Sequence, residues 1–152
     1  MAAKKVLFIC YGNIARSLMA EVYLKNLLSE KKLEIQVLSA GLNALGLPPA
    51  KETLEIMKEE LFVMQDHKAI QLTKDLLKEA DLVLTMEEIH KKAILFYYPH
   101  FKDKVFTLKE FAGEKENLDI KDPYGHDIKV YKMCYEEIKS AIDKSFDKII
   151  KF

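Results

Sequence analysis

Apolar positions along the chain form short runs separated by longer segments in which they recur every three or four residues. Runs of the first kind are candidate strands: Lys5–Cys10, Leu33–Leu38, Asp81–Met86 and Lys104–Leu108. Segments of the second kind are candidate helices: Ser17–Leu28, Lys51–Glu60, Thr73–Ala80, Glu87–Phe96 and about 127–150. Strands that alternate with helices indicate βαβ units, so the pattern predicts an α/β fold: a parallel sheet with helices on both faces.

The length of the chain fits one ordinary core. At 152 residues, with 49% hydrophobic residues and no Gly/Ser/Pro-rich linker, we expect a single domain over residues 1–152. The apolar stretch near the N-terminus, Val6–Cys10, is too short for a signal-peptide core, and no run is long enough to cross a membrane. We therefore expect a cytoplasmic protein with no membrane partner. A monomer is the default expectation, although the sequence does not reveal the oligomeric state.

Charge and cysteine content exclude further classes. The formal net charge is zero, with acidic and basic residues mixed along the chain, which does not favour nucleic-acid binding. Cys10 and Cys134 are far apart and form neither a disulfide framework nor a CxxC pair. His90, His100 and His126 lack metal-ligand spacing, so we expect no metal and no cofactor.

The only arginine among 24 basic residues, Arg16, lies where the first strand gives way to the first helix. A guanidinium is a planar fork of donors that matches two oxygens of a phosphate, whereas lysine suffices for solvated charge. Backbone N–H groups of residues 11–16 can surround an anion at the positive end of the helix dipole, with Gly12 expected to permit the turn. The segment therefore predicts a phosphate-binding loop after the first strand.

Cys10 stands six residues before Arg16, at the C-terminal end of the same strand. A cysteine is often only a small buried hydrophobe, and a bare C-x5-R match carries little weight. At a strand-to-helix turn that binds phosphate, however, the positive field favours the thiolate, and a thiolate beside a bound phosphoryl group is a nucleophile.

These residues resemble the signature V-C-x-G-N-x-C-R-S-P-x-A-E of the low-molecular-weight protein tyrosine phosphatases. The chain reads "ICYGNIARSLMAE", and it also contains "SAG" at 39–41, "DHKAIQLT" around His67, "ADLVLTM" at 80–86 and "DPYG" at 122–125. The matching signature positions are Cys10, Gly12, Asn13, Arg16, Ser17, Ala20 and Glu21. The resemblance spans essentially the whole chain.

The resemblance implies a four-stranded parallel sheet, no metal, phosphorylated protein substrates and inorganic phosphate as product. It implies Cys10 as the nucleophile of a phosphocysteine pathway, Arg16 as the phosphate clamp and Asp122 as the general acid and base. The loop that would bind phosphate comprises Tyr11, Gly12, Asn13, Ile14, Ala15, Arg16 and Ser17. Ser17 would hydrogen-bond the sulfur, Asn13, Ser39 and His67 would brace the loop, and the substrate pocket would include Ile14, Leu45 and Tyr124.

Asp122 could also belong to a turn without any catalytic role, because Asp, Pro and Gly all favour turns and "DPYG" alone is most often just a turn. Cleavage of a phosphomonoester nevertheless needs a proton for the leaving oxygen and later a base for water.

The chain departs from the family signature at Ala15, which replaces a second cysteine, and at Leu18, which replaces proline. Leu42, Leu45 and Leu47 stand where many animal members place a large aromatic residue.

Four functions remain open at this point. The first is a protein tyrosine phosphatase. The second is a protein arginine phosphatase, because residues 103–131 resemble that bacterial branch. Against it, Ile14 occupies a loop position at which threonine is typical of the arginine-specific members and isoleucine of the tyrosine-specific ones. The third, a thioredoxin-linked arsenate reductase, is disfavoured because no cysteine lies near positions 80–90. The fourth is a catalytically silent phosphate-binding module, which the presence of Cys10, Arg16 and Asp122 disfavours.

Overall fold

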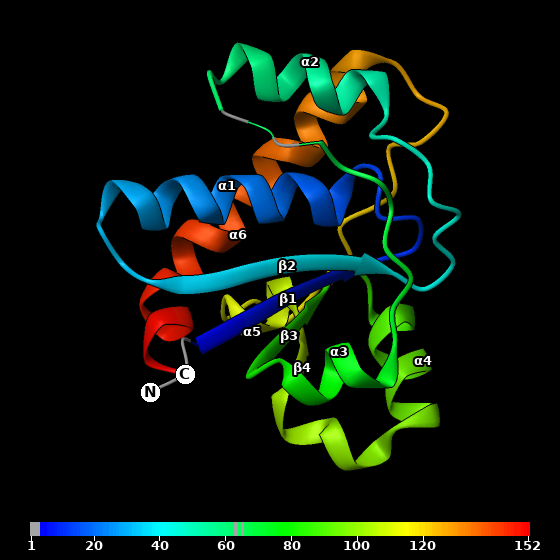
Figure 1. The fold of residues 1–152 in the computed structure, drawn as a ribbon, viewed down its shortest axis with the longest axis vertical. Coiled ribbons are helices and arrows are strands. Elements are labelled where there is room, and N and C mark those ends of the chain that lie inside the picture. Colours follow the sequence, from blue (N-terminus) through cyan, green and yellow to red (C-terminus); the bar gives the residue numbers. More distant parts are fainter. Residues whose placement is uncertain (1–3, 63, 65) are drawn as a thin grey trace.

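The computed structural model describes residues 4–62, 64 and 66–152. These residues form one parallel sheet with the strand order β2-β1-β3-β4, which confirms the predicted α/β fold and its four-stranded sheet (Figure 1). The strands are β1 Lys4–Cys10, β2 Ile35–Gly41, β3 Leu82–Thr85 and β4 Val105–Thr107. The first strand thus lies inside the sheet, paired on both sides.

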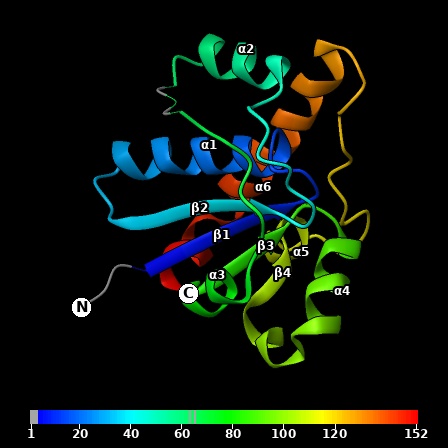
Figure 2. The ribbon, with the colours of Figure 1, turned by 45° about the vertical axis from the view of Figure 1, so that its right-hand side comes forward.

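Helices cover both faces of this sheet, as predicted. Figures 1 and 2 show α1, α2 and α6 over one face and α3 and α4 over the other. The helices are α1 Arg16–Glu30, α2 Lys51–Glu59, α3 Lys74–Glu79, α4 Glu88–Tyr97, α5 Leu108–Phe111 and α6 Ile128–Lys151, with a 3-10 helix η1 at Pro99–Lys104. Thr73 caps α3 through its side chain, which accepts a hydrogen bond from the Leu76 N–H.

The central strand β1 is buried on both faces, which explains its unbroken apolar sequence. Val6, Phe8 and Cys10 belong to the core under α1 and α6, whereas Leu7 and Ile9 belong to the core under α3 and α4. Alternation along the strand therefore turns the Cys10 side chain toward the α1 side, where the following loop begins.

Strand β2 differs from its expected position, because the sequence predicted Leu33–Leu38 and the structure has Ile35–Gly41. Leu33 and Leu38 are both more than a third exposed, whereas Ser39, Ala40 and Gly41 are buried. Pairing with β1 extends the strand past the apolar run as far as Gly41, which lies opposite Cys10. The prediction from hydrophobicity therefore placed this strand too early in the chain, because the buried end of the strand consists of small residues.

The expected fourth strand was also too long. Its last residue, Leu108, instead begins the short helix α5, because the Thr107 side chain accepts a hydrogen bond from the Glu110 N–H and caps that helix. The sequence analysis did not predict α5 or η1.

The carboxyl ends of the parallel strands and the segment before α6 meet at one edge of the sheet (Figure 2). The loop after β2 is tied to the loop after β1 by hydrogen bonds from the Leu42 N–H to the Cys10 carbonyl and from the Asn43 N–H to the Tyr11 carbonyl. Ligands of open α/β sheets bind at such an edge. Across the residues the structure describes, none of the helices combines the length and apolar character needed to span a membrane.

Candidate active site

The loop that joins β1 to α1 turns at Asn13 rather than at Gly12. Asn13 has a φ of 59°, in the left-handed region, whereas Gly12 is not among the residues with positive φ. The expectation that Gly12 provides the unusual backbone conformation was therefore wrong. Asparagine tolerates this conformation better than most residues because its short side chain can bond nearby groups.

The Asn13 side chain is completely buried and fastens the loop to two other segments. Its Nδ2 donates to Ser17 Oγ at 2.9 Å and to Ser39 Oγ at 2.8 Å, and its Oδ1 accepts from the Ile70 N–H at 2.9 Å. The His67 Nε2 lies 2.9 Å from the Asn13 carbonyl oxygen. The two residues expected to brace the loop, Ser39 and His67, thus both contact Asn13.

Cys10 is 2% exposed, and its sulfur lies inside the loop. It is 2.9 Å from Ser17 Oγ and accepts a hydrogen bond from the Asn13 N–H at 3.2 Å. The helix α1 starts only a few residues later, so its positive end lies near the sulfur. A hydroxyl, a backbone N–H and a helix dipole can together stabilise a negative charge on this sulfur.

Arg16 is buried, and its guanidinium is held by partners from two distant segments. Nη1 donates to Glu87 Oε2 at 2.6 Å and to the Ile120 carbonyl at 2.8 Å, while Nη2 lies 3.6 Å from Asp122 Oδ2. The sequence analysis missed Glu87 and the Ile120 carbonyl. Glu87 precedes α4 and follows β3 closely, so its place at the carboxyl edge of the sheet was the available signal.

The segment that carries Asp122 is fixed at the same edge. The Ile120 N–H donates to the Met86 carbonyl at 2.8 Å, and Asp119 Oδ1 accepts from the Glu88 N–H at 2.7 Å. Asp122 itself is about half exposed, with Oδ1 accepting from the Tyr124 N–H at 3.1 Å. A carboxyl group beside the arginine therefore remains accessible to a bound substrate and to water.

These groups open into one pocket of about 320 Å³. It is lined by Cys10, Tyr11, Gly12, Asn13, Ile14, Ala15, Arg16, Asn43, Leu45, Leu47, Asp122 and Tyr124. The pocket brings the three expected catalytic residues together with the three expected substrate-pocket residues. Tyr11, expected to contribute to phosphate binding as part of the loop, lines this pocket, and that role stays a prediction. The residue is half exposed, and its hydroxyl accepts a hydrogen bond from Asn43 Nδ2 at 3.0 Å.

Within the described ranges, no group of three or more His, Cys, Asp and Glu side chains is placed to hold a metal ion. The expected absence of a metal stays a prediction.

Comparison with known proteins places this architecture in a family. Residues 5–151 match the family model described as low molecular weight phosphotyrosine protein phosphatase. The protein-arginine-phosphatase of Bacillus subtilis is 36% identical over 141 residues, which cover 90% of this chain and 91% of that protein.

Two solved structures are similar throughout. The low molecular weight protein tyrosine phosphatase from T. tengcongensis has a TM-score of 0.90 and 40% identity, covering 96% of this chain and 99% of that chain. A YwlE arginine phosphatase in which cysteine is replaced by serine, with a phosphorylated active site serine, has a TM-score of 0.88 and 32% identity, covering 97% and 96% of the two chains. The present chain belongs to the low molecular weight phosphotyrosine protein phosphatase family and is therefore a phosphoric monoester hydrolase.

Proposed function

We propose that this protein hydrolyses phosphotyrosine in proteins through a phosphocysteine intermediate. The observation that carries the proposal is the convergence of Cys10, Arg16 and Asp122 in one pocket whose outer walls are apolar and aromatic. Cys10 and Arg16 are buried in this pocket and Asp122 is about half exposed, an arrangement that suits attack on a bound phosphoryl group.

In the first step, the Cys10 thiolate attacks phosphorus and the bond from phosphorus to the tyrosine oxygen breaks. Ser17 Oγ and the Asn13 N–H hold the sulfur in its reactive form. Because Nη1 of Arg16 is engaged by Glu87 and Ile120, the Nε and Nη2 groups are the fork that binds two phosphoryl oxygens. Asp122 delivers its proton to the departing tyrosine oxygen.

In the second step, water attacks the phosphorus of the phosphocysteine and the sulfur–phosphorus bond breaks. The Asp122 carboxylate accepts the proton from that water, and inorganic phosphate and the Cys10 thiolate are released. The phosphorylated serine in the related cysteine-to-serine mutant supports a phosphoryl acceptor at this position.

The walls of the pocket favour phosphotyrosine. Ile14, Leu45 and Leu47 present aliphatic groups, and Tyr11 and Tyr124 present aromatic rings. A phenyl ring buries apolar surface against such walls without leaving polar groups unpaired. A phosphorylated guanidinium carries N–H donors that the aliphatic side chains Ile14, Leu45 and Leu47 do not satisfy.

Dephosphorylation of phosphoarginine is the second candidate, because a relative of nearly the same length at 36% identity is named a protein-arginine-phosphatase. Asn43 and Asp122, which also line the pocket, contain oxygen acceptors that a guanidinium could use. Both candidates employ Cys10, Arg16 and Asp122. They differ in what the outer pocket binds and in the bond that breaks, which is phosphorus–oxygen in phosphotyrosine and phosphorus–nitrogen in phosphoarginine.

Steady-state kinetics with matched phosphotyrosine and phosphoarginine peptides decide between the two candidates. We expect a higher kcat/KM for phosphotyrosine, and the reverse order would assign the protein to phosphoarginine. Cys10→Ser should abolish turnover while retaining binding of inorganic phosphate, and Cys134→Ser, a control at the other cysteine, should remain active. Turnover by Cys10→Ser with either peptide would contradict the phosphocysteine mechanism.

A further inference from the structure

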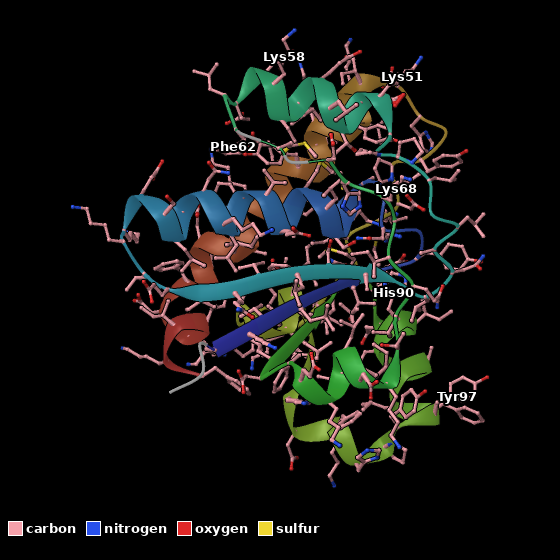
Figure 3. All side chains as sticks on the ribbon, viewed as in Figure 1. Lys51, Lys58, Phe62, Lys68, His90 and Tyr97 are labelled. Atoms are coloured by element: carbon pink, nitrogen blue, oxygen red, sulfur yellow. The ribbon has the colours of Figure 1, made fainter. Side chains whose placement is uncertain are left out.

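The carboxylate that holds Arg16 is itself held by a buried histidine. His90, at the start of α4, is 3% exposed and lies at the edge of the sheet that carries the site (Figure 3). Its Nδ1 accepts a hydrogen bond from the Glu87 backbone N–H at 3.1 Å. Its Nε2 lies 3.4 Å from Glu87 Oε2, the same oxygen that accepts from Arg16 Nη1.

These contacts select one form of the imidazole ring. Because Nδ1 is an acceptor, the ring proton is carried by Nε2, next to the Glu87 carboxylate. Protonation of Nδ1 would break the bond that closes the first turn of α4. Burial and the positive charge of Arg16 lower the pKa of His90 to about 4, although the carboxylates of Glu87, Asp119 and Asp122 act in the opposite direction. His90 is therefore neutral at physiological pH.

We propose that His90 is a positioning residue for Arg16, acting through the Glu87 carboxylate. The neutral ring keeps that carboxylate turned inward, where it fixes Nη1 and leaves the remaining guanidinium donors directed at phosphate. The Glu87 side chain is 25% exposed and has room to turn toward solvent when the ring is removed. Arg16 would then pair more closely with Asp122, whose Oδ2 is already 3.6 Å away, and that pairing competes with phosphate. The inference rests on the proposed function of Arg16 as phosphate clamp.

A double-mutant cycle tests this coupling. The variants are His90→Leu, Glu87→Gln and the pair, and each is titrated with inorganic phosphate and assayed with p-nitrophenyl phosphate. We expect His90→Leu to raise the phosphate Kd and to lower kcat/KM by roughly 10- to 100-fold. In the Glu87→Gln background the same substitution should have little further effect, because the group through which His90 acts has already been altered.

Two further variants separate positioning from a general loss of structure. His90→Gln keeps an acceptor for the Glu87 N–H and a donor for its carboxylate, so it should bind phosphate nearly as well as the wild type. Thr73→Ala removes the cap of α3, away from the pocket, and should lower stability without changing the phosphate Kd. Additive losses in the cycle, an unchanged Kd for His90→Leu, or an equally raised Kd for Thr73→Ala would overturn the proposal.

The wild type provides a test that requires neither turnover nor a variant that folds. Nitrogen NMR of the His90 ring should report the neutral tautomer with the proton on Nε2 throughout pH 5–8. A proton on Nδ1, or a charged ring at pH 6, would refute the inference. Because ring NMR and phosphate titration do not require catalysis, an inactive wild type would count against the proposed function and not against the role of His90.

Discussion

Gly41, the last residue of β2, lies so close to Tyr11 in the loop between β1 and α1 that no side chain fits between them. A Cβ atom on Gly41 would be 2.7 Å from the Tyr11 carbonyl oxygen and 3.1 Å from the Asn13 backbone nitrogen. Gly41 does not have a positive φ, so glycine is required here by the approach of two backbones and not by an unusual conformation. The end of β2 thereby supports the loop from behind.

Gly41→Ala should consequently disturb both stability and catalysis. The added methyl group meets backbone atoms that can move only together with the loop, and overpacking of this kind costs about 1–3 kcal/mol. Urea denaturation should report that loss, and kcat/KM should fall with it. Gly12→Ala is the stability control, because its Cβ would meet nothing closer than Ile14 Cγ1 at 3.9 Å. Equal destabilisation by the two substitutions would show that the close approach is not the cause.

Local sequence was sufficient to predict the centre of the fold and of the site. Strand β1 is buried on both faces, so its apolar run marks it clearly. Cys10 ends that strand and Arg16 begins the next helix, so their spacing along the chain already places them at one junction. Thr73 acts through its own helix turn, and its capping role was likewise predictable.

Contacts between distant segments could not be predicted in this way. Glu87 reaches Arg16 across 71 positions of the chain. Its place just after β3 puts it at the carboxyl edge of the sheet, but that place alone does not name Arg16 as its partner. Asn13 adopts the left-handed conformation because Ser39 and Ile70 bind its side chain, and these partners come from elsewhere in the fold. The shift of β2 has a similar origin, because pairing with β1 decides where that strand ends.

Asp122→Asn should slow substrates in proportion to their need for a proton. The leaving group of an activated aryl phosphate departs without protonation, whereas that of phosphotyrosine needs a proton, which we propose comes from Asp122. We expect a much larger fall in kcat for phosphotyrosine than for p-nitrophenyl phosphate. The asparagine still accepts from the Tyr124 N–H through its side-chain oxygen, so the local turn is preserved. Equal losses with both substrates would indicate that Asp122 only shapes the loop.

Oxidation of Cys10 should be poorly reversible in this protein. Ala15 provides no thiol beside Cys10, and burial raises the pKa of the Cys134 thiol to about 12, so very little thiolate is present there to attack a sulfenic acid. After peroxide treatment, thiol reductants should recover less activity from the wild type than from Ala15→Cys. A Cys10–Cys134 disulfide detected by mass spectrometry would contradict this expectation.

The neutral state of His90 should make stability depend on pH in a defined window. In the unfolded chain His90 takes up a proton below its ordinary pKa of about 6.5, whereas in the folded protein it does so only below about 4. Between these values the unfolded state binds more protons, so the free energy of unfolding falls as pH falls. His90→Gln does not titrate, and its stability relative to the wild type should therefore improve from pH 6.5 to pH 4. A constant difference over that range would contradict the assigned protonation state.

Substrate choice should respond to Ile14, whose side chain forms part of the pocket wall. Its backbone carbonyl accepts from the Ala50 N–H at 3.0 Å and from Thr53 Oγ1 at 3.2 Å, so the loop is anchored independently of the side chain. Leaving a guanidinium donor of phosphoarginine unpaired costs about 1–3 kcal/mol, or roughly 5- to 150-fold in rate.

Ile14→Thr supplies one hydroxyl acceptor, and Ile14→Val has nearly the same shape without it. We expect the ratio of kcat/KM for phosphoarginine to that for phosphotyrosine to rise in Ile14→Thr and to stay close to the wild-type value in Ile14→Val. An equal rise in both variants would mean that pocket volume, and not hydrogen bonding, selects the substrate at this position.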